Sequence, residues 1–393
     1  FNEYLPNPVG ESLFLTPTNE NEIYSLIMSL PNKTSSGYDG VSNILLKGIS
    51  KQLLTPLCIV FNKSMEEGIF PEKMKMSVIT PLYKAKDKHL MTNYRPVSLL
   101  PVISKVLEKL VHKRTYNFLT RNDVLYESQY GFRNKHSTIN AVTELVGNIL
   151  NGFEKNQVTV CLFLDLSKAF DTLEHSTLLA KLENYGIRGI ALNWFTSYLS
   201  NRSHYVKYNG VKSDMNKTPI RYGVPQGSVL GPLLYLIFCN DLYKCVKESR
   251  LIMFADDSSV SKTHENIKFI FETLTKELSI VIDWFRANKL SLNLSKTNYV
   301  VFKPKSMVID LNGLEISFGN DIVERVDVTK FLGLLVDMNL NWNQHISKVQ
   351  TKLSQSLYLL RNFKKTVPQW AMKNIYQAHF HSHMNYGLIL WGP

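Results

Sequence analysis

The stretch VTVCLFLDLSKAFD, residues 158–171, decides how the fold of this chain is interpreted. Its first seven residues form a near-continuous apolar run of strand length that is rich in β-branched side chains. Such a run predicts a strand covered on both faces, because a half-exposed strand would alternate apolar with polar residues. Asp165 ends the run, and a helical stretch is predicted from about Ser167. A carboxylate at the end of an apolar strand is costly unless it is solvated, paired or bound to a cation.

A second acidic position follows at Asp256 and Asp257. Leu251 to Val260 is predicted to form a strand, a tight turn and a strand, with both aspartates at the turn. Carboxylates on neighbouring strands can bridge two Mg²⁺ ions roughly 3.5–4 Å apart. Magnesium accepts one or two carboxylates and takes the rest of its shell from water and phosphate. An Asp-Asp pair alone usually marks a turn, so the predicted metal site depends on the combination with Asp165.

Between these acids lies YGVPQGSVLGP, residues 222–232. Gly223, Gly227 and Gly231 recur every four residues and allow the backbone to approach another group closely. Gln226 adds a neutral side chain that can both donate and accept hydrogen bonds. Taken alone, this stretch predicts a Gly/Pro loop before a buried helix.

Lys and Arg outnumber Asp and Glu by 45 to 33 over 393 residues, which gives a net charge of +12. This surplus favours a polyanionic partner, although a merely basic soluble protein is the alternative. The longest apolar run, Val229–Cys239, contains Gly231 and Pro232 and is too short to span a membrane. No signal peptide opens the chain at Phe1, and both ends look cut, so we expect a fragment of a longer polypeptide.

Four cysteines show no C-x-x-C spacing, so we expect buried, reduced thiols rather than zinc or disulfides. A metal cluster at His379, His381 and His383 is not expected, because only the first and third would share a helix face.

Helices and strands are predicted to alternate, which indicates an α+β fold with a sheet that carries the acids and a helical C-terminal unit. The predicted segments are a helix from Thr18 to Leu30, a helix through Leu45–Phe61, a strand at Met76–Tyr83, a helix at Ile103–Leu119 and a helix from Trp342. The last of these would bury a stripe formed by Ile346, Val349, Leu353, Leu357 and Leu360. Along the helix at 103–119, Lys105, Lys109, Lys113 and Arg114 would face either solvent or phosphate.

Three ordered motifs carry a specific resemblance. FLDLSKAFD (163–171), GVPQGSVLGP (223–232) and FADD (254–257) resemble the A, B and C palm motifs of reverse transcriptases. Their variants are similar to those of non-LTR, LINE-type and jockey-like retrotransposons. Further similar blocks cover nearly the whole chain, namely 81–84, 93–100, 129–133, 136–138, 288–293, 296–297, 331–333, 385–386 and 391–392.

The resemblance implies a right-hand polymerase with fingers, a palm built on an antiparallel sheet and a helical thumb. Its expected divisions are an N-terminal extension at 1–63, a reverse transcriptase domain of fingers and palm at 64–337, and a C-terminally truncated thumb at 338–393. It also implies Mg²⁺ as cofactor, two ions with Mn²⁺ as a substitute. Asp165 and Asp256 would be the principal metal ligands, joined by the Leu166 carbonyl, with Asp257 as a neighbouring catalytic acid.

The resemblance further implies nucleotide-binding roles. Phe170 would be a steric gate against ribose, with an aromatic in a helix core as the alternative. Lys84 and Arg95 would hold the triphosphate, and Gln226 and Gly227 would line the nucleotide path. Lys296 would lie near the leaving pyrophosphate, with a plain surface lysine as the alternative. Asp171 is expected to be a structural hydrogen-bonding group, whereas Tyr130, Phe132 and Arg133 could grip template, or Phe132 could belong to the core.

The implied activity is RNA-directed DNA polymerisation with dNTPs, an RNA template and a DNA primer or target. An endonuclease domain would belong to a parent polyprotein. The expected location is the nucleus and cytoplasm, as a ribonucleoprotein that is neither secreted nor membrane-bound. The alternatives are an RNA-dependent RNA polymerase or maturase-type relative, and a catalytically decayed element fragment that only binds nucleic acid.

Overall fold

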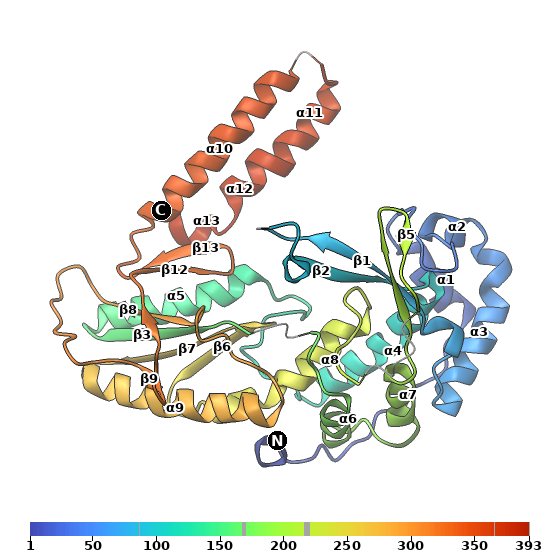
Figure 1. Cartoon of the computed structure of the whole chain (residues 1–393), viewed down its shortest axis with the longest axis horizontal. Coiled ribbons are helices and arrows are strands. Elements are labelled where there is room, and N and C mark those ends of the chain that lie inside the picture. Colours follow the sequence, from blue (N-terminus) through green and yellow to red (C-terminus); the bar gives the residue numbers. More distant parts are fainter. Residues whose placement is uncertain (86, 167–169, 216–220, 365, 393) are drawn as a thin grey trace. The chain divides into compact units, whose positions relative to one another are not determined.

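The computed structural model describes residues 1–85, 87–166, 170–215, 221–364 and 366–392. The chain forms two compact units (Figure 1). Unit 1 contains Phe1–Tyr126, Lys168–Leu242 and Trp284–Leu290, and unit 2 contains Glu127–Ser167, Tyr243–Asp283 and Ser291–Pro393.

Unit 1 is rich in helices. They are η1 (Asn2–Tyr4), α1 (Glu20–Met28), α2 (Asn43–Gly48), α3 (Ser50–Glu67), η2 (Glu72–Met74), η3 (Met91–Asn93), α4 (Val102–Arg121), α6 (His175–Asn184), α7 (Gly189–Leu199) and α8 (Leu230–Cys239), with η4 (Asn240–Cys245) at the boundary. All residues of α8 except Pro232 are buried, as expected for a helix that is apolar on every side. The α3 helix ends at Glu67 and is capped by Gly68, whose φ of 67° lies in the left-handed region that glycine adopts freely.

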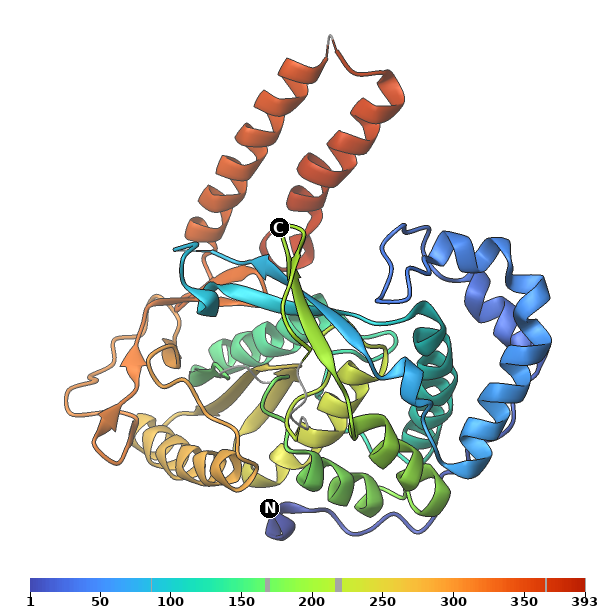
Figure 2. The ribbon, with the colours of Figure 1, turned by 45° about the vertical axis from the view of Figure 1, so that its right-hand side comes forward.

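A four-stranded sheet completes unit 1 (Figure 2). Its strands are β1 (Ser77–Tyr83), β2 (Tyr94–Leu99), β4 (His204–Tyr208) and β5 (Val211–Lys212), in the order β2-β1-β4-β5. β1 and β2 form an antiparallel hairpin in which Tyr83 is opposite Tyr94. β1 and β4 are parallel.

Unit 2 is built on a five-stranded sheet. Its strands are β3 (Val158–Leu164), β6 (Arg250–Phe254), β7 (Asp257–His264), β8 (Asn298–Phe302) and β11 (Glu324–Arg325), in the order β11-β8-β3-β7-β6. β3 is antiparallel to both β7 and β8, and all seven of its residues are buried.

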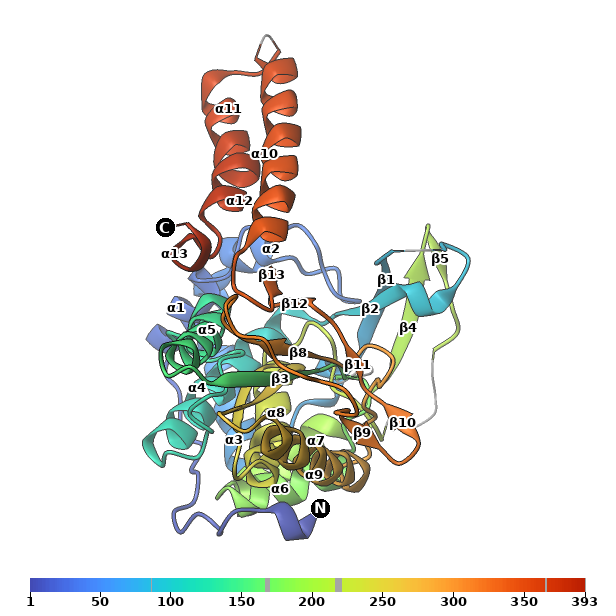
Figure 3. The ribbon, with the colours of Figure 1, turned by 90° about the vertical axis from the view of Figure 1, so that its left-hand side faces the viewer.

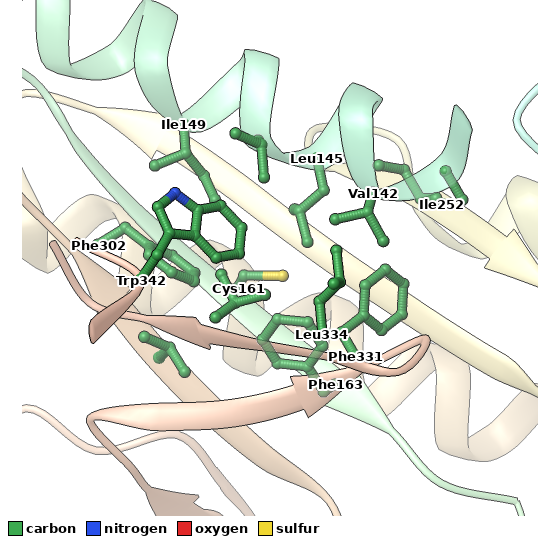
Figure 4. Packing of buried hydrophobic residues seen from close by; sticks show 14 residues of the cluster. Val142, Leu145, Ile149, Cys161, Phe163, Ile252, Phe302, Phe331, Leu334 and Trp342 are labelled. Carbon is green, nitrogen blue, oxygen red and sulfur yellow. The ribbon is translucent and has the colours of Figure 1, made fainter. Parts of the chain in front are cut away.

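Helices α5 (Thr138–Glu154) and α9 (Ile267–Ala287) lie on opposite sides of β3, which explains the burial of both faces (Figure 3). On the α5 side, Cys161 and Phe163 of β3 pack against Leu145 and Ile149 (Figure 4). On the other side, the ring of Phe271 from α9 lies 5.7 Å from that of Tyr299.

The rest of unit 2 follows the sheet. It comprises β9 (Ser317–Phe318), β10 (Asp321–Ile322), β12 (Val328–Phe331), β13 (Leu334–Asp337), α10 (Asn343–Phe363), α11 (Gln369–Ile375), the π-helical η5 (Tyr376–His381), α12 (Ser382–Asn385) and α13 (Leu388–Trp391). The Asp337 carboxylate accepts backbone N–H bonds from Asn339, Asn341 and Trp342, which fixes the turn into α10. Tyr386 directly follows α12, and its hydroxyl donates to the Leu332 carbonyl of the β12–β13 hairpin.

Most of the predicted elements are confirmed, and β3 has the predicted bounds of 158 and 164. The helical pattern predicted through Leu45–Phe61 is confirmed, but it is divided into two helices, because α2 ends at Gly48 and α3 begins at Ser50. The helix predicted from Ser167 falls partly on residues 167–169, outside the described residues, and α6 begins only at His175.

The predicted stripe of α10 is also wrong in part. Val349 is buried, but Leu357 is 44% exposed and the more distal buried position is Ser356. Ser356 lies against η5, where its hydroxyl donates to the His379 carbonyl.

Among the described residues, no helix is both long enough and apolar enough to cross a membrane. Cys58, Cys161, Cys239 and Cys245 form no disulfide, and all except Cys58 are buried.

Candidate active site

Asp165, Asp256 and Asp257 lie at one end of the sheet in unit 2. β3 and β7 pair with Leu164 opposite Ser258, so Asp165 and Asp257 occupy the next position of the same register. Residues that are opposite each other in an antiparallel pair project from the same face of the sheet. Phe254 at the end of β6 pairs with Asp257 at the start of β7. Asp256 is the second residue of the two-residue loop between these strands. The predicted grouping of Asp165 with the second acidic position is therefore confirmed.

These carboxylates repel one another. The pKa of Asp257 is raised to about 6, mainly because its carboxylate is partly removed from water and, to a smaller extent, because Asp256 and Asp165 repel it. The Lys330 ammonium on β12 acts in the opposite direction. Sequence reasoning missed Lys330, because a single lysine within a short strand carries no sign that it faces acids.

Lys296 contacts the acidic group directly. Its Nζ lies 3.3 Å from Asp165 Oδ2, and its side chain remains 62% exposed. The Asn293 N–H donates to the Asp165 carbonyl at 2.8 Å, so the 293–297 turn is held against the end of β3. Lys296 therefore lies beside Asp165, whereas its predicted place near the leaving pyrophosphate stays a prediction.

The acidic group fits a divalent cation by its donor chemistry. Asp165 and Asp257 offer hard carboxylate oxygens, and their mutual repulsion is what a bound cation would relieve. The adjoining Leu166 lies at an antiparallel bridge with Leu292, so its carbonyl belongs to the same corner of the sheet. No cluster of three or more His, Cys, Asp or Glu side chains that could hold a metal occurs among the described residues, the three histidines at 379–383 included. Mg²⁺ needs only one or two carboxylates when phosphates and water complete its shell, so this set suffices.

The glycine-rich loop of unit 1 is fixed by its own backbone. The Gln226 carbonyl accepts from Ser98 N at 2.7 Å, and the Gln226 side chain donates to Asp171 Oδ1 at 2.7 Å. Gly227 has a φ of +120°, and a Cβ there would lie 2.8 Å from the Ser98 carbonyl oxygen. A glycine is therefore required for this loop to approach β2. The structural hydrogen-bonding role predicted for Asp171 is confirmed.

Phe170 lies beside this loop. Its carbonyl accepts from Val224 N at 3.0 Å, and its half-buried ring stacks on Tyr235 of α8 with centroids 4.6 Å apart. Phe170 and Asp171 form a turn, and residues 167–169 lie outside the described residues, so the alternative of an aromatic in a helix core stays open. The ring is held in place, as a steric gate requires.

Sequence reasoning also missed Glu108, a fully buried carboxylate on α4. It accepts from Val229 N at 2.8 Å and Leu230 N at 3.2 Å, and so it caps the start of α8 directly after the glycine-rich loop. Ser104 and Tyr198 donate to it through their hydroxyls. Burial raises the pKa of Glu108, while nearby Arg202 and these backbone hydrogen bonds lower it.

Lys84 and Arg95 lie at the tip of the β1–β2 hairpin, and both are exposed. Arg95 is opposite Leu82, and Lys84 N donates to the Asn93 carbonyl at 2.8 Å, so the ladder continues past β1. Side chains alternate along a strand, which places Lys84 and Arg95 on the same face as diagonal neighbours.

The four basic residues of α4 fit neither expectation fully. Lys113 and Arg114 both pair with Glu22 of α1, at 2.9 and 3.0 Å, and this lowers the pKa of Glu22 to about 2. Burial lowers the pKa of Lys105 and of Lys109. Lys113 and Arg114 therefore join α4 to α1, and Lys109 donates to the Ser29 hydroxyl.

The block around residue 130 lies in unit 2. The Tyr130 hydroxyl donates to Glu144 of α5, and Arg133 donates to the carbonyls of Glu127 and Gln129. Phe132 is 47% exposed, so its assignment to the core is wrong.

Comparison with known proteins identifies the family of this chain. Residues 83–336 match the family described as reverse transcriptase (RNA-dependent DNA polymerase). The chain belongs to this family.

The chain is similar to three proteins of Drosophila melanogaster. It is 30% identical to the probable RNA-directed DNA polymerase from transposon BS over 99% of this chain and 44% of that protein. It is 29% identical to the RNA-directed DNA polymerase from mobile element jockey over 99% and 43% of the two chains. It is 28% identical to the probable RNA-directed DNA polymerase from transposon X-element over 96% and 42%. The chain thus spans less than half the length of these relatives.

Proposed function

We propose that this chain is the RNA-directed DNA polymerase core of a non-LTR retrotransposon, which adds dNTPs to a primer 3′-OH by a two-metal mechanism. The observation that carries the proposal is the acidic end of the unit-2 sheet, where Asp165, Asp256 and Asp257 repel one another in a chain of the reverse transcriptase family. Carboxylates concentrated in this way favour the binding of divalent cations, on which phosphoryl transfer depends.

Asp165 and Asp256 would hold Mg²⁺, with Asp257 and the Leu166 carbonyl beside them and with Mn²⁺ as a substitute. When bound, the metal supplies Lewis-acid activation of the primer hydroxyl and neutralises charge on the phosphates. The protein contributes mainly position and electrostatic complementarity rather than covalent chemistry. Lys296 would exchange its contact with Asp165 for the leaving pyrophosphate, to which it would donate a proton.

The groups of unit 1 would select and hold the nucleotide. Lys84 and Arg95 project from one face of the β1–β2 hairpin, which suits two cations that grip a triphosphate. Gln226 and Gly227 would line the nucleotide path. Phe170 would exclude a ribose 2′-hydroxyl, because its ring is fixed against Tyr235 and cannot easily move aside.

The right-hand arrangement is part of the proposal. Residues 64–337 would supply fingers and palm, residues 338–393 the thumb, and residues 1–63 an N-terminal extension. The charge of the last segment supports a nucleic-acid contact, since residues 338–393 contain no Asp or Glu. Their basic residues are Lys348, Lys352, Arg361, Lys364, Lys365 and Lys373.

A hollow of about 750 Å³ on the α10–α11 pair combines three of these cations with Trp370, which is 71% exposed. Exposed aromatic rings among cations are typical of single-strand binding. An RNA template and a DNA primer or target are the partners we propose. In the parent polyprotein, an endonuclease would provide the nicked target, and the ribonucleoprotein would occupy nucleus and cytoplasm.

Primer extension on poly-A/oligo-dT with Mg²⁺ and dTTP tests the proposal. Wild-type protein should incorporate dTTP and Asp256→Ala should not. Equal incorporation by both would contradict the assignment of this aspartate. Strongly salt-dependent RNA binding without incorporation by wild-type protein would instead identify a decayed, binding-only fragment.

A further inference from the structure

A short segment before α5 lies along the free edge of the unit-2 sheet. β6 is the last strand of that sheet, and Gln129 forms a parallel bridge with Met253 of β6. Met253 N donates to the Ser128 carbonyl at 2.9 Å, and Tyr130 N donates to the Met253 carbonyl at 2.7 Å. Residues 128–131, here called the edge segment, therefore pair with β6 through an isolated bridge at Gln129, next to the Ala255–Asp256 loop.

The Gln129 side chain reaches that loop. It is 3% exposed, and its Oε1 accepts from Gly131 N at 2.8 Å and from Ala255 N at 3.2 Å. Ala255 is the first residue of the loop that carries Asp256, and its φ is +55°. A left-handed alanine is unfavourable by itself and persists only where its surroundings hold it. The bond from Gln129 is such a constraint, because it fixes the N–H of the strained residue.

Gly131 makes this approach possible. A Cβ at residue 131 would lie 2.3 Å from Ala255 N and 3.0 Å from the Phe254 carbonyl carbon. Backbone atoms cannot yield as the end of a flexible side chain can. Any side chain at 131 would therefore push the edge segment away from the loop.

Glu144 of α5 holds the edge segment from the helix side. Its carboxylate accepts from Ser128 Oγ at 3.2 Å and from the Tyr130 hydroxyl, and it pairs with Arg250 at 2.7 Å. The edge segment is thus tied to α5 through residues 128 and 130 and to the acidic loop through residues 129 and 131.

We propose that Gln129 and Gly131 are positioning residues that hold the Ala255–Asp256 loop so that Asp256 and Asp257 stand beside Asp165. Neither residue touches substrate in this account. The effect on the loop and on cation affinity follows from the contacts above, whereas the effect on catalysis rests on the proposed polymerase function.

The test uses the full chain with matched substitutions at residues 128 and 129. Gln129→Met keeps the volume and removes the acceptor. Gln129→Glu keeps an oxygen at the Oε1 position, and it replaces Nε2, which has no hydrogen-bond partner among the described residues. Ser128→Ala is the control, because it removes a buried hydrogen bond of the same segment that leads to Glu144 and not to the loop.

Three measurements follow for each variant: hydrogen exchange of the peptide covering 251–258, Mn²⁺ affinity from the electron paramagnetic resonance of free Mn²⁺, and kcat and KM for dTTP. Gln129→Met should exchange faster at the loop, bind Mn²⁺ about tenfold more weakly and lose about 10- to 100-fold in kcat, as losses in the outer shell of metal sites do. Its KM for dTTP should stay unchanged, since its contacts are to the loop. Gln129→Glu should restore slow exchange, and Ser128→Ala should behave as wild type.

Wild-type exchange and wild-type Mn²⁺ affinity in Gln129→Met would overturn the proposal. Losses of the same size in Ser128→Ala would also overturn it, because they would show a general loosening of the edge segment. Gly131→Ala provides a second route if Gln129→Met does not fold, and it should show the same three changes. A wild-type protein that incorporates no nucleotide would defeat the polymerase proposal, while exchange and Mn²⁺ affinity would still decide the role of Gln129.

Discussion

Glu108 in unit 1 and the aspartates at the end of β3 and β7 in unit 2 carry the same functional group in opposite surroundings. Glu108 is fully buried and receives hydrogen bonds from two backbone N–H groups and two hydroxyls. Asp256 and Asp257 are exposed, and Asp257 is surrounded by like charge that raises its pKa to about 6. A buried carboxylate with all its hydrogen bonds stabilises the fold. Carboxylates that repel one another at a surface destabilise the fold, and their function is to bind a ligand.

The largest effect is expected when one charge is removed from the aspartates at the end of β3 and β7. Asp165→Asn should reduce dTTP incorporation by about 10³-fold or more, because it removes charge that is needed where phosphates react. Its melting temperature should be equal to or higher than that of wild type, since repulsion is relieved. Asp321→Asn, an exposed aspartate on β10, is the control and should retain activity. A large fall in the melting temperature of Asp165→Asn would mean that Asp165 is structural.

The opposite outcome is expected at Glu108. Glu108→Leu should lower the free energy of unfolding by about 3 kcal/mol, because the N–H groups of Val229 and Leu230 would lose their acceptor in a buried place. Glu108→Gln keeps one oxygen and should lose less. Urea unfolding followed by circular dichroism measures both. Identical unfolding midpoints for Glu108→Leu and wild type would refute the structural role.

A substitution at Phe170 tests the selection of dNTPs over rNTPs rather than the effect of charge. Phe170→Ala should raise the incorporation of rNTPs relative to dNTPs by about 10- to 100-fold, as expected when a small steric exclusion is removed. Phe170→Tyr keeps the ring and should stay selective. The ratio is measured with single nucleotides on a primed template. An unchanged ratio in Phe170→Ala would remove the steric gate from the proposal and leave Phe170 as packing for Tyr235.

The smallest expected effect is a pH dependence of stability. The pKa of Asp257 is raised in the folded protein to about 6 from its usual 3.8, so folding favours the protonated carboxyl. The stability that this group contributes is complete below its unfolded pKa and is lost as the pH rises through about 6. The melting temperature of wild type should therefore fall more between pH 4 and pH 7 than that of Asp257→Asn. Parallel profiles for the two proteins would show that the repulsion at Asp257 is negligible.

Much of unit 2 could be predicted from the sequence, because its features are local. Seven consecutive apolar residues ending at an aspartate indicated a buried strand with a carboxylate at its end, and β3 has those bounds. The hairpin with Asp256 at its turn was predicted from Leu251–Val260 as a strand, a tight turn and a strand.

Features that depend on distant parts of the chain could not be predicted. Glu108 lies among lysines on a helix, and the two N–H groups that explain it are more than a hundred residues away. The roles of Lys330 and Gln129 depend on the fold of unit 2, which places both residues near the Ala255–Asp256 loop and Asp257. The α10 stripe fails for a related reason, since periodicity shows which face of a helix is apolar but not what covers it, and Leu357 remains exposed.

The central claim, that the end of β3 and β7 is a two-metal site, is tested most directly by anomalous diffraction. Crystals of the chain with template, primer and an unreactive dNTP analogue would be soaked in Mn²⁺, for wild type and for Asp165→Asn. We predict anomalous peaks between the carboxylates of Asp165 and Asp256 in wild type and their loss in the variant. A wild-type map with bound nucleotide and no peak at these carboxylates would contradict the claim.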